Sequence, residues 1–199
     1  MYAIVESGNI TQTFNNPRKL VINNIRYSTK IYSLWTVAEK KAIGLYEVEY
    51  NDTNKKDEEY YINTNQTLAY DSSADKVTAS YGTATAKAIA DRNATDKDGV
   101  ELDPVVVIKG LKTIKKEMIN DQCEDILSSS DWRVIKAKET GGTMNSGWKT
   151  WRASVRTKCN SMQTQIDNAS DVDALATLFT YTETDGVTSR PLGEFPKKQ

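Results

Sequence analysis

The chain has 199 residues, of which 38% are hydrophobic and 27% are charged, and its formal net charge is −1. A charge this close to zero gives no overall field that would attract the chain to nucleic acid or to an anionic membrane. The sequence contains no histidine, which removes the most common general base and the most common metal ligand of enzymes. We therefore expect a protein that is not an enzyme and that binds no cofactor or metal. We also expect no signal peptide and no membrane span, because no stretch of about 18 apolar residues occurs.

Short segments of alternating polarity in residues 1–92 predict a β-rich N-terminal domain with one short helix. "MYAIVE" and "NITQTF" flank Ser7-Gly8 and predict a hairpin. Thr36 and Glu39 have the spacing of a capping box, so a short helix should begin there and end before Gly44. The predicted strands that follow are "LYEVEY", "YYINT", "QTLAY" and "KVTASYG". We interpret the many tyrosines as half-buried strand residues, in preference to an aromatic surface for a partner or a glycan.

The middle of the chain is polar and charged. "TATAKAIADRN", residues 83–93, is compatible with a short helix, and residues 93–108, marked by Gly99 and Pro104, predict a linker. Asp96, Asp98 and Glu101 in this linker are similar to part of a calcium-binding loop. The full series of alternating acidic residues with a terminal glutamate is absent, so we expect no metal there.

After the linker the apolar period changes from two to 3.6, which predicts a helical domain over residues 109–182. The first long helix has an apolar stripe at steps of three and four, formed by Leu111, Ile114, Met118, Gln122 and Ile126 and widened by Ile119, Cys123 and Leu127. A short apolar piece from Asp131 to Ile135 follows. A third helix should start at Ser170, and residues 183–199 should form an extended tail. The predicted fold class is thus α+β, with a β-rich module followed by a helical hairpin or bundle. Cys123 and Cys159 both fall in helical patterns, so we expect two buried, reduced thiols.

The second long helix contains "WKTWRASVRTK", residues 148–158, which combines two tryptophans with four basic side chains. Such a segment is either a platform that stacks bases and binds phosphates or one face of an ordinary helix. We favour the helix, because one apolar seam passes through Trp148, Trp151, Val155, Cys159, Met162 and Ile166. Arg152 and Arg156 lie at the border of this seam, where acidic residues of the preceding helix (Glu117, Asp121, Glu124 and Asp125) would pair with them. A nucleic-acid-binding module and an enzyme that uses only carboxylates remain alternatives.

The segments "ILSSSDW" and "WKTWRASVR" together resemble the C-terminal region of bacteriophage tail-fibre assembly proteins and related tail proteins. The matching residues are Leu127, Asp131, Trp132, Trp148, Trp151, Arg152, Val155 and Arg156. The N-terminal half is similar to the opening of phage tail-associated virion proteins, in which a strand pair precedes "LW", "AE" and "AIG". This chain departs from the family at Trp151 and Val155, where tyrosine and leucine are usual, and "GEFP" replaces a Trp-Pro ending.

The resemblance implies a structural component of a phage tail, either a tail-fibre or a tail attachment protein. Such a protein is made in the host cytoplasm, resides in the virion, and contacts other phage tail proteins as a homo-oligomer or in multiple copies. The alternative within the same family is a tail-fibre assembly chaperone that is not retained in the particle. The candidate interaction or architecture residues are Trp35, Trp132, Trp148, Trp151, Arg152 and Arg156.

Overall fold

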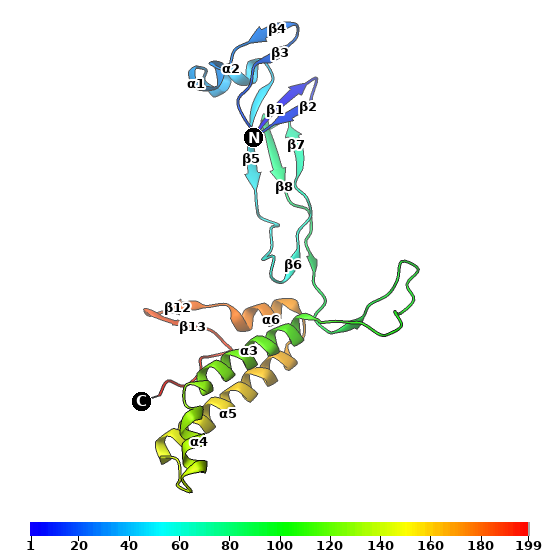
Figure 1. Ribbon diagram of the computed structural model, residues 1–199. Coiled ribbons are helices and arrows are strands. Elements are labelled where there is room, and N and C mark those ends of the chain that lie inside the picture. Colours follow the sequence, from blue (N-terminus) through cyan, green and yellow to red (C-terminus); the bar gives the residue numbers. More distant parts are fainter. Residues whose placement is uncertain (199) are drawn as a thin grey trace. The chain divides into compact units, whose positions relative to one another are not determined.

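The structure is a computed structural model that describes residues 1–198 (Figure 1). It confirms the predicted α+β class, with 34% helix and 25% strand, a β-rich N-terminal half and helices towards the C-terminal end. The chain divides into two compact units: the first ends at Thr85, and the second begins at Ala86. The boundary therefore precedes the segment 93–108 that we expected to be a linker.

The first unit is built on a five-stranded sheet. Its strand order is β2 (Asn9–Phe14), β1 (Tyr2–Glu6), β5 (Leu45–Asn51), β8 (Lys76–Ser80) and β7 (Thr67–Asp71). Strands β5 and β8 are parallel, whereas the other neighbours are antiparallel. The short strand β6 (Tyr61–Ile62) precedes β7 in sequence, and β9 (Thr85–Ala86) lies at the boundary of the unit. All the strands predicted from alternation in this region are present.

Two tight hairpins depend on residues that tolerate left-handed backbone. The predicted β1–β2 hairpin turns at Ser7 and Gly8, whose φ angles are 51° and 80°. The second hairpin joins β3 (Leu20–Ile22) to β4 (Ile25–Tyr27) through Asn23 and Asn24, with φ angles of 50° and 66°. Two-residue hairpin turns with positive φ at both positions match the right-handed twist of the strands, and asparagine and glycine adopt them at low cost.

Two short helices follow these hairpins, where we expected one. Helix α2 (Val37–Ala42) is the predicted helix, and its capping box is formed in both directions. The Glu39 amide donates to Thr36 Oγ1 at 3.2 Å, and the Thr36 amide donates to Glu39 Oε2 at 2.7 Å. Helix α1 (Ile31–Leu34) is one turn long and has no side-chain cap, so it left no capping signal in the sequence.

The sheet buries side chains on both of its faces. Successive residues of β1 alternate, so that Ala3 and Val5 pack on one face and Ile4 packs on the other. The face of Ile4 is covered by the β3–β4 hairpin and by Ile31 of α1. Since β1 is buried on both sides, it reads as an apolar run instead of a strict alternation.

The second unit begins with a paired arm. Strands β10 (Arg92–Asn93) and β11 (Val107–Ile108) are antiparallel, and Thr95 bridges to Glu101 within the arm. The helix expected over residues 83–93 is wrong. The Ala88 and Ile89 carbonyls accept hydrogen bonds from the amides of Leu111 and Lys112 at the start of the next helix, so they are not available as partners within a helix of their own.

Helices α3 (Leu111–Ser128) and α5 (Ser146–Asn168) pack together. The seam on α5 is confirmed for Val155, Cys159, Met162 and Ile166, all of which are buried. On α3 the predicted stripe is confirmed at Leu111, Ile119 and Cys123, whereas burial of Lys115 was not predicted. Ile114, which the predicted stripe included, is 46% exposed. The Lys115 ammonium group lies 4.5 Å from the centre of the Phe179 ring, and such a contact favours the buried cation.

Two shorter helices and a hairpin complete this unit. Helix α4 (Asp131–Glu139) replaces the short apolar piece that we expected. Helix α6 (Val172–Phe179) is capped by Asp171, one residue after the predicted start. Strands β12 (Thr182–Thr184) and β13 (Val187–Ser189) then pair. The expected extended tail is thus a hairpin followed by a docked segment, in which Leu192 is fully buried and its carbonyl accepts from Lys158 Nζ at 2.8 Å.

Two glycines in the first unit have the same φ angle of +80° but different surroundings. A Cβ atom on Gly8 would meet nothing, whereas one on Gly44 would overlap the Val5 carbonyl oxygen. We predict that Gly8→Ala costs about 1 kcal/mol of stability and that Gly44→Ala costs roughly 3 kcal/mol or more. Urea unfolding followed by the NMR signal of the Trp35 indole, which lies in this unit, measures both. Equal losses for the two variants would contradict the steric argument.

Candidate functional site

The candidate residues fall in two places. Trp35 belongs to the first unit, where it is half-buried and packs edge-on against Tyr27 with 5.7 Å between ring centres. The other candidates lie in the second unit, on α4 and the first half of α5. The structure brings residues of the two quoted segments together here: Asp131 meets Arg152, and Trp132 and Trp148 contact the same side chain.

Helix α4 is the most exposed helix of the second unit, since none of its residues is buried. Asp131 lies in its first turn, and Lys136 and Lys138 lie in its last turn. Charges in these positions favour the helix because they oppose its dipole. Its apolar side chains are nevertheless exposed, with 52% of Trp132, 44% of Val134 and 56% of Ile135 open to solvent. The helix therefore has an apolar side that no other described element covers.

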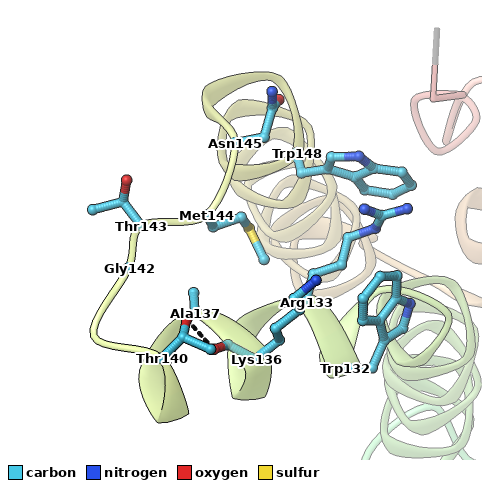
Figure 2. A pocket seen from close by; sticks show the side chains of 10 residues that line it. All are labelled: Trp132, Arg133, Lys136, Ala137, Thr140, Gly142, Thr143, Met144, Asn145 and Trp148. Atoms are coloured by element: carbon cyan, nitrogen blue, oxygen red, sulfur yellow. Dashed lines mark hydrogen bonds between the residues drawn. The ribbon is translucent and has the colours of Figure 1, made fainter.

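Arg133 is held between two indole rings (Figure 2). The central carbon of its guanidinium lies 4.4 Å from the centre of the Trp132 ring and 4.3 Å from the centre of the Trp148 ring. We call these three residues the Trp–Arg–Trp stack. Each cation–π contact of this kind contributes about 0.5–2 kcal/mol, so the stack joins α4 to the first turn of α5.

The stack forms one wall of a pocket of about 180 Å³ between α4, the following loop and α5. Lys136 and Met144 also line this pocket (Figure 2). Within residues 1–198, the guanidinium of Arg133 has no carboxylate partner, and its Nε atom is buried without a hydrogen-bond partner. This pocket thus contains a cation that is fixed in position and still has free donors.

Arg152 has a different role from the one we expected. Its side chain is buried on α5, not at the border of the seam. It donates to the Leu127 carbonyl at 2.7 Å, to Ser130 Oγ, and to the Asp131 carboxylate at 2.5 Å. The Leu127 carbonyl lies in the last turn of α3, where carbonyls have no partner within the helix, and it also accepts from the Ser130 amide at 3.0 Å and from Ser130 Oγ at 2.8 Å. Arg152 therefore caps α3 and anchors the start of α4, and the acidic face of α3 is not its partner.

Arg156 does not form the predicted pair either. It is exposed and makes no ion pair within the described part of the chain, and Glu117 pairs instead with Lys109 at 2.5 Å. Trp151 is half-buried, and its indole N–H donates to the Pro196 carbonyl at 2.9 Å. Its ring meets that of Trp148 edge-on at 5.5 Å. Both tryptophans are thus only partly buried in the seam. Trp151 connects α5 to the C-terminal segment, and Trp148 connects it to Arg133 of α4.

Arg133 is the residue that the sequence reasoning missed. Its neighbour Trp132 was recognised, but a single arginine in "DWRVIK" carries no periodic signal. Its site forms only when Trp132 of α4 and Trp148 of α5 come together around it, and α4 was not predicted to be a helix.

The two cysteines are free and buried, as predicted. They face each other between α3 and α5. Burial, together with the hydrogen bond and charge interaction with Cys159, raises the pKa of the Cys123 thiol to about 11, and the nearby Arg156 acts in the opposite direction. A thiol with such a pKa stays protonated at neutral pH and is a poor nucleophile.

The acidic residues of the arm have a structural use. The Asp96 carboxylate accepts from the amides of Asp98 at 2.9 Å and of Val100 at 3.0 Å, which closes the turn at Gly99. Within residues 1–198 no three cysteine or acidic side chains are grouped in a way that could hold a metal ion. No helix in the same range is long and apolar enough to cross a lipid bilayer.

Comparison of the chain with models of known protein families, with curated proteins and with solved structures gave no match. The site must therefore be interpreted from its own geometry.

We predict that Arg152→Met lowers the free energy of unfolding by about 2–4 kcal/mol, because it removes the charged hydrogen bonds from the buried guanidinium to the Leu127 carbonyl, Ser130 Oγ and the Asp131 carboxylate. Its ion pair contributes little of this, since Asp131 is about half exposed. Arg156→Met is the matched control and should change stability by less than about 0.5 kcal/mol. Thermal unfolding of the full chain measures both. Similar losses for the two variants would show that Arg152 has no special structural role.

We also predict that Cys123 reacts slowly with iodoacetamide at pH 8. A pKa of about 11 leaves roughly a hundredfold less thiolate than in an unperturbed cysteine. Mass spectrometry of the Cys123 peptide after timed alkylation gives the rate, and the chain unfolded in urea is the control. Comparable rates in the folded and unfolded chain would contradict the raised pKa.

Proposed function

We propose that the protein is a structural component of a bacteriophage tail and acts through contacts with other tail proteins in the virion. One observation carries the proposal: α4 presents Trp132, Val134 and Ile135 to solvent on a helix that buries no residue. Exposed apolar side chains grouped beside aromatic residues and arginine are typical of protein–protein interfaces.

The resemblance supplies the phage context. Its two quoted segments lie apart in the sequence, yet their residues Asp131 and Arg152 form an ion pair and the Trp–Arg–Trp stack joins Trp132 to Trp148. The similarity to tail proteins therefore concerns residues that form one small three-dimensional cluster. This cluster holds α4 in place, so that its apolar side is available to a partner. In a tail, repeated copies would make individually weak contacts sufficient.

Quantitative mass spectrometry of purified phage particles tests the proposal. We expect the chain in a fixed stoichiometry relative to the other tail proteins. Presence in infected cells but absence from particles would refute the structural role and favour the assembly chaperone.

The contribution of α4 is tested by substitution in the phage genome. Ile135→Asp places a charge on the exposed apolar side and should reduce incorporation into particles by at least about tenfold, as expected for a charge left unpaired in an interface. Ile114→Asp is the matched control, because Ile114 is similarly exposed on another helix of the same unit. If both variants are incorporated normally, α4 is not the contact surface.

A further inference from the structure

The two indole rings restrict the directions from which a partner can reach the guanidinium of Arg133. The two indole rings flank it, with their centres 4.4 and 4.3 Å from its central carbon (Figure 2). A guanidinium donates its hydrogen bonds in its own plane, through a fork that matches the two oxygens of a carboxylate. The stack thus holds the fork in a fixed orientation before any partner arrives.

The surroundings of the fork are positively charged. Residues 131–156 contain six basic and two acidic side chains, which gives this segment a net charge of +4 in a protein whose net charge is −1. One of the two acidic residues, Asp131, is already paired with Arg152. Lys136 lines the same pocket as Arg133. The pocket therefore favours an anion.

The size of the pocket limits what can enter it. Its volume of about 180 Å³ is below the range of roughly 300–1,000 Å³ that is usual for cofactors and other small-molecule ligands. Met144 and the indole of Trp148 provide apolar walls beside the cations. A single short side chain with an apolar stem and a charged end fits this combination.

We infer that the Arg133 pocket binds one carboxylate of a partner protein, either an aspartate or glutamate side chain or the carboxylate at a chain end. This inference deepens the proposed function and rests on it, because it takes the partner to be a protein. Nucleic acid is the less favoured occupant. The indole faces turned towards Arg133 are already occupied, so a base could stack there only after the arginine had moved out.

Binding of defined probes to the full chain tests the inference. The first probe is the blocked peptide acetyl-Gly-Glu-Gly-Glu-Gly-amide, which offers only side-chain carboxylates. The second is acetyl-pentaglycine with a free carboxyl terminus, which offers only a chain end. The third is a single-stranded oligothymidylate. Titration at low salt, followed by tryptophan fluorescence and calorimetry, should show binding of at least one of the two peptides.

The choice of variants separates a fitted site from general attraction between charges. Arg133→Lys retains the charge but loses the planar fork, and should weaken peptide binding by about tenfold or more. Lys138→Gln removes a charge from α4 outside the pocket and should weaken it by less than about threefold. If Arg133→Lys does not fold, as judged by circular dichroism, Lys136→Gln takes its place, because Lys136 lines the pocket and is exposed.

Three results would overturn the inference: no binding of either peptide, a larger effect of Lys138→Gln than of the pocket variant, or tighter binding of oligothymidylate than of both peptides. The outcome is independent of the virion experiments. If neither peptide binds but Ile135→Asp still reduces incorporation into particles, only the inferred carboxylate site is refuted. If a peptide binds but the chain is absent from particles, the carboxylate site is supported and the structural role in the tail is refuted.

Discussion

The second unit depends on one buried guanidinium. Arg152 of α5 donates to the last turn of α3, to Ser130 in the connection and to Asp131 at the start of α4. The buried guanidinium needs these acceptors, because a cation without hydrogen-bond partners is costly in a low-dielectric interior. A single side chain therefore fixes where α3 ends and in which direction α4 leaves. The exposed apolar side of α4 and the Trp–Arg–Trp stack both follow from that direction.

The two arginines of the "WRASVR" segment illustrate how four residues on a helix can separate a structural from a surface role. Arg152 reaches inward to three acceptors, whereas Arg156 lies in the open beside the cysteine pair. Arg133, which lies outside that segment, is stacked between rings and keeps its donors free. The positive charge of Arg152 thus serves packing, whereas that of Arg133 remains available for recognition.

The sequence was sufficient where a local rule decides the structure. The capping box at Thr36, the turn at Ser7-Gly8 and the period-2 strands are all local, and they were predicted correctly. It was insufficient where distant groups compete for the backbone. Residues 83–93 have helical composition, yet the Ala88 carbonyl accepts from Leu111 instead. On α3 the buried Lys115, which lies against Phe179, was missed, because no apolar periodicity reveals a buried lysine. For the same reason Arg133 could not be recognised before α4 and α5 were placed together.

The contact between Trp151 and Pro196 also bears on the order in which the chain can assemble. The two partners are 45 residues apart, and Lys158 is 34 residues from its acceptor, Leu192. Every strand pair of the five-stranded sheet, by contrast, lies within the first 85 residues. During synthesis the sheet can therefore form while the partners of α5 are still missing. Until the C-terminal segment is synthesised, Trp151 and Lys158 of that helix lack their acceptors. The second unit is therefore the part of the nascent chain on which a chaperone can act.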